Sequence, residues 1–419
     1  MKLKENDNVP EIRFDYFKEE WDKKRFKDFT KLSQGLQIAI SSRFLEDGEH
    51  RYFYITNEFL NPNSTKKYYI ESPSENVICT VDDILMTRTG NTGKVITNIS
   101  GAFHNNFFKV DYDKFETSKM FLYYLLTSND IQKEIIIRAG NSTIPDLNHS
   151  DFYSIKTSVP ALAEQSAIGT LFRTLDELLA SYKDNLANYQ SLKATMLSKM
   201  FPKAGQILPE IRLDGFETGW ECVKMADIFQ IIDGDRGKSY PGESDFSSFG
   251  HTLFLDTGNL KKTGLDFSTT KFISEEKDKE LRNGKLILGD FILTSRGTLG
   301  NVAYYNENIQ KRYSSVRINS AMLILRPLLG AKISPEYILA VLRGNLISDF
   351  MKVNQVGSAQ PHITKKEFSK IKVLVPYNIQ EQQAIGTYFS NLDSLITAYQ
   401  EKISQLETLK KKLLQDMFI

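Results

Sequence analysis

The 419-residue chain has few of the residues that metal and disulfide chemistry require. Its two cysteines, Cys79 and Cys222, form no CxxC motif and lie far apart in the sequence. Five histidines, at positions 50, 104, 149, 251 and 362, are scattered without the spacing of metal ligands. We therefore expect no metal site in this chain and two free thiols in a reducing compartment.

Long apolar runs are also missing. The longest, such as 135–137 and 321–325, are much shorter than the roughly 20 residues that cross a bilayer. The first residues, MKLKENDNVPEIRF, have no apolar stretch after their lysines, so we expect no secretory leader. The composition, 41% hydrophobic and 25% charged, is typical of globular domains. Together these features predict a cytoplasmic protein.

The chain has no excess of positive charge, with 53 Lys and Arg against 52 Asp and Glu. Residues 1–160 carry 21 basic and 23 acidic side chains, and residues 206–376 carry 23 and 20. A protein that held DNA mainly through its phosphates would be more basic than this. Any binding of DNA must therefore depend on local loops or on positive charge from a partner.

Catalytic motifs are missing too, since HExxH, GxSxG and a GxGxxG after a strand do not occur. GDRGKS (234–239) has Ile232 where a phosphate-binding loop needs its first glycine, and GNTGK (90–94) has the wrong spacing. Asp266 with the run 275–277 (Glu-Glu-Lys) matches only a loose nuclease pattern that is common in charged segments. The tetrapeptide at 61–64, Asn-Pro-Asn-Ser, is not that of an amino-methyltransferase. The sequence therefore predicts a protein that is not an enzyme.

What the sequence does contain is an internal duplication. Several segments recur in the same order, and residues 164–201 and 381–418 agree at 16 of 38 positions without gaps. The order and length of the repeat indicate a doubled domain plan and not a solenoid. The paired segments are PEIRFDYFKEEW (10–21) with PEIRLDGFETGW (209–220), TRTGNTGKV (87–95) with TSRGTLGNV (294–302), and EQSAIGTLF (164–172) with EQQAIGTYF (381–389).

Each half begins with a region of short apolar runs separated by Gly, Asn, Ser and Pro, which predicts strands and turns. We expect one α+β domain with a mixed, twisted sheet in residues 1–160 and another in residues 206–376. Helices are expected at Lys119–Ser128 and Pro335–Arg343. The strand-like runs are NVICTV (76–81), DILMTR (83–88), KLILGD (285–290) and AMLILRP (321–327).

Each half ends in a segment with heptad spacing, at 161–205 and 377–419, which predicts a long helix with an apolar seam. At one level the seam is interrupted by Asn185 and Lys402; either these polar residues fix the alignment, or Leu186 and Ile403 replace them. The predicted seam residues are Ile168, Leu171, Leu175, Leu178, Tyr182, Tyr189, Leu192 and Met196 in the first helix, and Ile385, Tyr388, Leu392, Leu395, Tyr399, Leu406, Leu409 and Leu413 in the second.

An exposed apolar stripe of this length requires a partner helix. The other copy in the same chain is the nearest candidate, and dimerisation through the same stripes is the alternative. We expect the two helices to pack as an antiparallel coiled coil, which would carry the two globular domains to opposite ends.

With these features the chain closely resembles the specificity subunits of type I restriction-modification systems over nearly its whole length. The duplicated segments carry the resemblance, together with GDRGKSYP (234–241) and the pair GNSTIPDL (140–147) and GSAQPHIT (357–364). The first half departs from this pattern around 33–35 (Ser-Gln-Gly), where GDRGKSYP has no clear equivalent.

The resemblance implies two target-recognition domains, each reading one half of a split, asymmetric DNA site. It implies that the paired helices set the spacing and dock two DNA-adenine methyltransferase subunits. S-adenosylmethionine would be bound by those subunits, ATP and Mg²⁺ by partner subunits that include ATP-dependent restriction subunits, and no cofactor by this chain. The alternative is a coiled-coil interaction protein whose globular domains do not bind DNA. A fused restriction-methylation enzyme is disfavoured by the missing motifs.

The candidate DNA-binding residues lie in the glycine-rich loops. Arg pairs with guanine and Asn or Gln with adenine in the major groove, and glycine lets backbone N–H groups approach phosphates. The competing interpretations are ordinary turn glycines and arginines in surface ion pairs. The candidates are Arg88, Thr89, Asn91, Thr92, Lys94, Asn141, Ser142 and Thr143 in the first domain, and Arg236, Lys238, Ser239, Tyr240, Ser295, Arg296, Thr298, Ser358 and Gln360 in the second.

Overall fold

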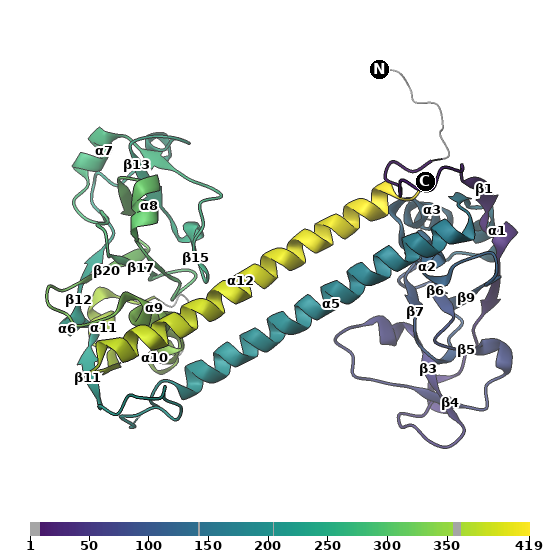
Figure 1. The fold of residues 1–419 in the computed structure, drawn as a ribbon, viewed down its shortest axis with the longest axis horizontal. Coiled ribbons are helices and arrows are strands. Elements are labelled where there is room, and N and C mark those ends of the chain that lie inside the picture. The colour runs from purple at the N-terminus through teal and green to yellow at the C-terminus, as the bar shows by residue number, and fades with distance from the viewer. Residues whose placement is uncertain (1–8, 141–142, 204, 355–361) are drawn as a thin grey trace. The chain divides into compact units, whose positions relative to one another are not determined.

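A computed structural model describes residues 9–140, 143–203, 205–354 and 362–419 (Figure 1). The chain forms two compact units, the first of residues 1–183 with 402–419 and the second of residues 184–401. Each unit holds one globular domain and a segment of each of two long helices, α5 (Leu162–Lys199) and α12 (Ile379–Asp416). The predicted long helices are therefore confirmed, and both are shared between the units.

The first domain is built on two four-stranded sheets, in the orders β2-β9-β6-β7 and β4-β3-β8-β5, and on the two-stranded ribbon β1-β10. Its strands are β1 (Asp22–Arg25), β2 (Thr30–Gln34), β3 (Arg51–Ile55), β4 (Tyr69–Glu71), β5 (Ile78–Cys79), β6 (Ile84–Thr87), β7 (Val95–Thr97), β8 (Gly101–Phe103), β9 (Phe107–Tyr112) and β10 (Lys156–Val159). Its helices are α1 (Phe26–Phe29), α2 (Lys119–Thr127), α3 (Asn129–Ala139) and α4 (His149–Ser154), with short 3-10 turns at Ile40–Ser42, Asn57–Leu60 and Glu75–Val77.

The second domain has sheets in the orders β12-β20-β17-β18 and β16-β13-β19, the pair β14-β15, and the ribbon β11-β21. Its strands are β11 (Trp220–Lys224), β12 (Phe229–Asp233), β13 (Thr252–Leu255), β14 (Leu260–Lys261), β15 (Gly264–Leu265), β16 (Phe272–Ile273), β17 (Phe291–Thr294), β18 (Val302–Tyr304), β19 (Val316–Ile318), β20 (Met322–Pro327) and β21 (Lys372–Pro376). Its helices are α6 (Met225–Ile228), α7 (Glu275–Glu280), α8 (Glu307–Arg312), α9 (Pro335–Arg343), α10 (Leu346–Asn354) and α11 (Lys365–Phe368), with 3-10 turns at Glu243–Asp245 and Thr257–Asn259.

The two domains share one topology. Each has one parallel strand pair, β3 with β8 and β13 with β19, among antiparallel neighbours. After that pair the same hydrogen bond recurs, from His104 N to Ile55 O in the first domain and from Asn319 N to Leu255 O in the second, both at 2.9 Å. The predicted duplication of a mixed α+β domain is therefore confirmed.

The predicted helices at Lys119–Ser128 and Pro335–Arg343 are confirmed as α2 and α9. The predicted strand KLILGD (285–290) is wrong. Asp290 folds back to accept a hydrogen bond from Ile287 N at 2.8 Å, which makes a turn that leaves Ile287 and Leu288 about half exposed. The strand β17 begins only at Phe291, after this turn.

Each domain is anchored to the first turn of a long helix by a buried ion pair. Arg13 donates from Nε to Glu164 at 2.7 Å, and Arg212 makes the same bond to Glu381 at 2.7 Å. Both carboxylates are almost fully buried. A buried carboxylate needs such a partner because losing it leaves an uncompensated charge. The repeated PEIR and EQ segments are thus the two sides of one contact.

The residue after each glutamate caps a helix of its domain. Gln165 accepts from Ser118 N at 2.9 Å, and Gln382 accepts from Ser334 N at 2.8 Å. Ser118 and Ser334 are the N-cap residues of α2 and α9. Each glutamine also donates to the preceding proline carbonyl at 2.8 Å. The side chain that starts the long helix therefore also fixes the first turn of the domain's helix.

Aromatic side chains close the same region of each unit. In the first unit Phe418 lies 5.8 Å from Phe172 and 5.7 Å from Phe121, ring centre to ring centre. In the second unit Phe201 lies 5.6 Å from Phe389 and 5.9 Å from Tyr337. The end of one long helix thus packs against the start of the other through equivalent rings.

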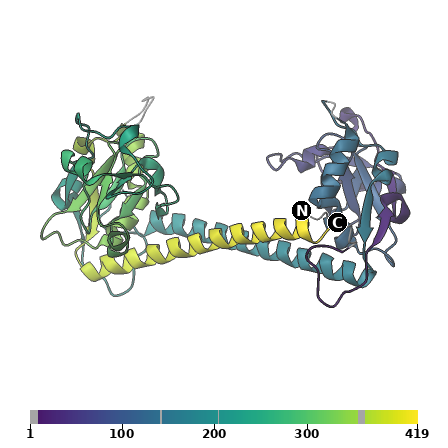
Figure 2. The same ribbon diagram turned by 90° about the horizontal axis from the view of Figure 1, so that it is seen from above.

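The segments of α5 and α12 pack antiparallel within each unit (Figures 1 and 2). In the first unit Lys410 contacts Asp176, and Lys183 contacts Glu407 at 2.7 Å. In the second unit Lys193 contacts Asp393 at 2.5 Å, and the rings of Tyr189 and Tyr399 are 5.3 Å apart. Residue numbers rise along one helix as they fall along the other, so the antiparallel pairing is confirmed.

The buried positions of the helix pair differ in part from the predicted seam. Phe172, Leu179 and Phe389 are buried although the heptad count omits them. At the interruption Ile403 is buried and Lys402 is exposed, so the neighbouring apolar residue replaces the polar one there. At position 178 the neighbouring Leu179 is buried in place of the predicted residue. Four predicted seam leucines are 37–44% exposed: Leu178, Leu192, Leu395 and Leu409.

The close approach of α12 to α9 generates a stability prediction. A Cβ on Gly386 would lie 2.5 Å from the backbone of Glu336 and Tyr337. Gly386→Ala should therefore destabilise the second unit by about 1–3 kcal/mol, through overpacking against backbone that cannot move aside. Thermal unfolding of the full chain measures this. Gly219→Ala is the matched control because nothing lies within 4 Å of its Cβ position, and equal losses in both variants would contradict the prediction.

Candidate nucleic-acid interface

The two repeated glycine loops have the same internal geometry. Thr87 donates from Oγ1 to Asn91 O at 2.6 Å and accepts from Lys94 N at 2.9 Å. Thr294 makes the equivalent bonds to Thr298 O and from Asn301 N. A buried threonine thus pins each loop, and the side chains at its tip are held on a fixed backbone.

Positive φ angles explain the glycines in these loops. Gly90 and Gly297 have φ of +59° and +71°, the left-handed region that disfavours other residues. Asn91 also has positive φ, at +75°, which asparagine tolerates better than most residues do. The glycines therefore have a structural reason to be present, whether or not a ligand approaches them.

In the first domain the loop is tied to residues 145–147. Arg88 forms a two-bond ion pair with Asp146, at 2.9 and 2.6 Å, and its guanidinium lies 5.6 Å from the ring centre of Phe108. Thr92 donates to Pro145 O at 2.8 Å. Arg88 therefore forms a surface ion pair, which was the alternative to a role in DNA binding.

The other candidates of the first domain are distributed as follows. Thr89 is half-buried and pairs with Asp146 as an isolated β-bridge, so it orders the loop. Asn91, Lys94 and Thr143 are exposed, while Asn141 and Ser142 lie outside the described residues.

In the second domain the loops converge on one turn, residues 319–321. A Cβ on Gly234 would lie 2.0 Å from Asn319 O, so the GDRGK loop can approach this turn only with glycine. Arg236 donates to Ser320 O at 3.1 Å. Ser295 N donates to Ala321 O at 2.9 Å, which brings the TSRG loop to the same place.

The exposed residues at this convergence are mainly cationic. Arg236, Lys238, Arg296 and Thr298 are exposed. Arg236 forms an exposed ion pair with Asp233 at 3.6 Å, whereas Arg296 has no ion pair with any residue in the described ranges. Ser295 is buried and donates to Ala321 O, so it positions the loop. The remaining candidates are the half-buried Ser239 and Tyr240, with Tyr240 packed on Phe254, and Ser358 and Gln360, which lie outside the described residues.

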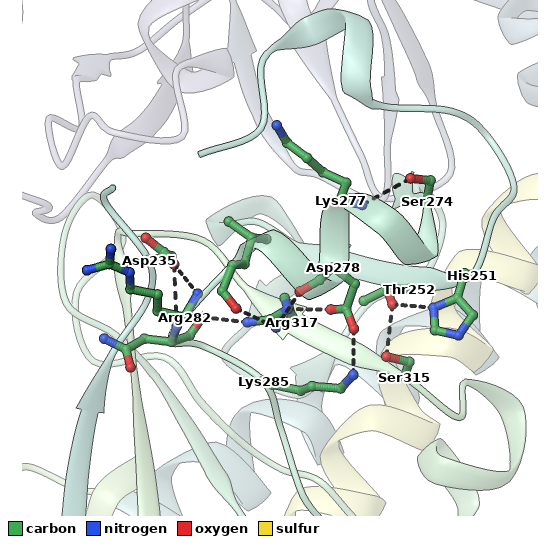
Figure 3. A network of polar contacts seen from close by, with 12 residues as sticks. Asp235, His251, Thr252, Ser274, Lys277, Asp278, Arg282, Lys285, Ser315 and Arg317 are labelled. Atoms are coloured by element: carbon green, nitrogen blue, oxygen red, sulfur yellow. Dashed lines mark hydrogen bonds and ion pairs between the residues drawn. The ribbon is translucent and has the colours of Figure 1, made fainter. Parts of the chain in front are cut away.

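A buried carboxylate, Asp235, locks the GDRGK loop to a second loop (Figure 3). It accepts from Gly237 N at 2.7 Å, Arg282 N at 2.6 Å and Asn283 N at 3.4 Å. Burial opposes ionisation, but these N–H donors outweigh it and hold the pKa of Asp235 below its usual value. Asp235 therefore stays charged and fixes the backbone of residues 235–237 and 282–283.

A second buried carboxylate, Asp278, fixes the other side of that loop (Figure 3). It contacts the buried Arg317 and accepts from Lys285 Nζ at 2.5 Å. Arg317 also donates to Asn283 O at 2.7 Å and Leu281 O at 3.1 Å. Burial raises the pKa of Asp278, but the hydrogen bonds and charges of Lys285 and Arg317 lower it by more, so the pKa lies below its usual value.

These contacts present Arg282, an exposed residue that sequence reasoning missed. Arg282 lies outside every glycine-rich motif, and its link to Asp235 joins segments 47 residues apart. Only the RNG triplet at 282–284, an arginine before a turn glycine with φ of +89°, could have indicated it. The second domain therefore exposes three arginines on loops that are tied together.

The loose nuclease pattern has a structural explanation. Glu275, Glu276 and Lys277 form the first turn of α7, capped by Ser274, and Lys277 pairs with Asp245 at 3.5 Å. No group of three or more potential metal ligands occurs in the part of the chain that the structure describes. Over the same residues, no helix is both long and apolar enough to cross a membrane.

The family model described as type I restriction modification DNA specificity domain matches the chain twice, at residues 18–188 and 217–408. The chain belongs to this family. Its curated relatives include the MjaVIII specificity subunit of a type I restriction enzyme from Methanocaldococcus jannaschii, 22% identical over 99% of this chain and 96% of that protein. A putative type I specificity subunit of Mycoplasma genitalium is 23% identical over 73% of each chain.

Solved structures of the specificity family share the fold. The S subunit of a type I restriction-modification system from M. genitalium aligns over 98% of this chain and 99% of that one, with a TM-score of 0.63 and 18% identity. A chain from a study of complex assembly and conformational transition of the type I system aligns over 94% and 96%, with a TM-score of 0.52 and 16% identity. Because the chain belongs to this family, it is a non-catalytic subunit that recognises DNA sequence within a restriction-modification complex.

The Asp278–Arg317 pair generates a prediction about the loop it holds. Asp278→Ala leaves Arg317 buried without a counter-charge and should cost about 3–5 kcal/mol in stability. Removing both charges with Asp278→Ala/Arg317→Ala should recover part of this loss. Thermal unfolding, with hydrogen exchange of residues 278–285, measures both effects. A double variant no more stable than the single variant would show that the pair's charge is not what holds the loop.

Proposed function

We propose that each domain reads one half of a split, asymmetric DNA site through the loops described above. The observation that best supports this proposal is that the two domains have equivalent glycine loops, each held by a buried threonine, and that these loops expose different side chains. In the second domain these include Arg236, Arg282 and Arg296, whose donor groups suit guanine O6 and N7. In the first they are mainly amide, hydroxyl and lysine groups. A protein that recognises two different half-sites needs different exposed side chains on the same loop backbone.

This proposal accommodates the near-neutral charge of the chain. Three loop arginines give the second domain hydrogen-bond donors in one region, although its basic and acidic residues nearly balance overall. Phosphate contacts that provide sequence-independent affinity would then come largely from partner subunits. The alternative, a coiled-coil protein whose domains do not bind DNA, gains no support from the family to which the chain belongs.

We further propose that the exposed leucines of the helix pair dock two DNA-adenine methyltransferase subunits. Leu178 and Leu409 are 39% and 44% exposed in the first unit, and Leu192 and Leu395 are 37% and 41% exposed in the second. The duplication relates the members of one pair to those of the other. Two equivalent pairs of exposed leucines, one pair per unit, fit two copies of one partner.

The chemistry of the complex would then lie outside this chain. S-adenosylmethionine would bind the methyltransferase subunits, and ATP and Mg²⁺ the restriction subunits. We place this assembly in the cytoplasm, where genomic DNA is available and where the free Cys79 and Cys222 would stay reduced. The paired helices would set the spacing between the two half-sites.

Arg296→Ala should weaken recognition of one half-site only, by about 1–3 kcal/mol, if its guanidinium makes a bidentate contact with guanine. Competition binding measures this with duplexes carrying single-base changes in each half, using the chain together with its methyltransferase. Arg312→Ala, an exposed arginine of the same domain on α8, is the matched control. An equal loss of affinity on every duplex would identify Arg296 as a phosphate contact and contradict the prediction.

Leu178→Glu should remove one docked methyltransferase, because a carboxylate in an apolar interface costs several kcal/mol to desolvate. Adding Leu395→Glu should remove the second. Analytical ultracentrifugation of the mixed subunits reads the stoichiometry as two, one and zero partners. The control is Leu329→Glu, a fully exposed loop leucine outside the helices. Unchanged stoichiometry in the double variant would place the docking surface elsewhere.

A further inference from the structure

The first domain has an equivalent of the GDRGK loop that its sequence conceals. Gly35 follows β2 as Gly234 follows β12, and each is held by a backbone bond, Gly35 N to Phe107 O at 3.3 Å and Gly234 N to Met322 O at 3.4 Å. A Cβ on Gly35 would lie 2.4 Å from His104 O, as one on Gly234 would meet Asn319 O. Two residues after each glycine stand Gln37 and Arg236.

Gln37 and Arg236 contact the same turn. The strand pairing makes residues 104–106 of the first domain equivalent to 319–321 of the second, because Arg88 N donates to Asn106 O at 2.8 Å where Ser295 N donates to Ala321 O. Arg236 bonds to Ser320 O, and Gln37 accepts from Asn105 Nδ2 at 3.1 Å. Gln37 thus occupies the position of Arg236.

The backbone before Gln37 is fixed on both sides. Leu36 N donates to Phe103 O at 3.0 Å, and Leu36 O accepts from Asn105 N at 3.2 Å. In the second domain the corresponding residue is Asp235, which performs this task by binding residues 282–283. Both domains therefore hold the next side chain rigidly, by different chemistry.

The amide of Asn105 faces inward. Its Oδ1 is buried and has no hydrogen-bond partner within the described ranges, and its Nδ2 is used by Gln37. Gln37 is exposed, and none of the described residues accepts a hydrogen bond from its Nε2. Asn105 is therefore a positioning residue, and Gln37 is the group that can reach a ligand.

We propose that Gln37, oriented by Asn105, reads an adenine in the half-site of the first domain, at the position where Arg236 reads a guanine in the other half-site. This rests on the proposed function. With Oε1 held by Asn105, the amide still offers Nε2–H to adenine N7 and the second Oε1 lone pair to adenine N6–H. A guanidinium offers donors only, which suits guanine O6 and N7.

The test selects bound sequences from a pool of fully randomised DNA duplexes, using the full chain with its methyltransferase. The wild-type complex should select a split motif. Gln37→Ala should reduce the preference for adenine about tenfold or more at one position of one half, because a bidentate base contact is lost. Gln37→Arg should change the preferred base there from adenine to guanine. Arg236→Ala should affect only the other half.

Asn105→Ala should relax the same position as Gln37→Ala without lowering the melting temperature, which a purely structural residue would not do. Gln206→Ala, an exposed glutamine in the segment between α5 and β11, is the matched control and should leave the motif unchanged. A wild-type complex that selects no split motif would overturn the proposed function. A wild-type split motif that the Gln37 variants leave unchanged, or weaken equally at every position, would overturn the assignment of Gln37 alone.

Discussion

The buried ion pair between the PEIR arginine and the first-turn glutamate of each long helix is the contact on which the rest of each unit depends. Arg13–Glu164 and Arg212–Glu381 hold a domain to a helix at a point where the carboxylate is almost fully buried and has no water to replace its partner. The neighbouring glutamine then fixes the first turn of α2 or α9. Because one short segment performs both tasks, the domain and the helix cannot shift independently.

The contacts that hold each domain to the long helices are therefore made by other residues than those that the loops expose. The anchors, the pinned threonine loops and the parallel strand pair are the same in both copies, while the exposed loop residues differ. In the second domain two buried carboxylates, Asp235 and Asp278, add rigidity that the first domain achieves with backbone pairing around Leu36. Recognition can therefore diverge at the tips without changes in the framework.

The sequence predicted the parts whose signal is periodic or repeated: the long helices, their antiparallel pairing and the doubled mixed fold. It did not predict the parts that depend on contacts between distant segments. Leu178 and Leu395 match the heptad count but are 39% and 41% exposed, and beside Leu178 the neighbouring Leu179 is buried instead. Residues 285–290 read as a strand, yet Asp290 closes them into a turn. Among the candidate residues, Arg88 is in an ion pair, while Arg282 and Gln37 become visible only when the loops are placed in space.

The two-stranded ribbons have a consequence for how such genes change. Asp22 pairs with Val159 in β1-β10, and Trp220 pairs with Pro376 in β11-β21, so the chain enters and leaves each domain through adjacent strands. Everything between those strands is an insertion with neighbouring ends, while the Arg–Glu anchor lies outside it. A recombination event with both crossovers in one ribbon could exchange a whole reading domain as a cassette, and the recipient would acquire a new half-site in a single step.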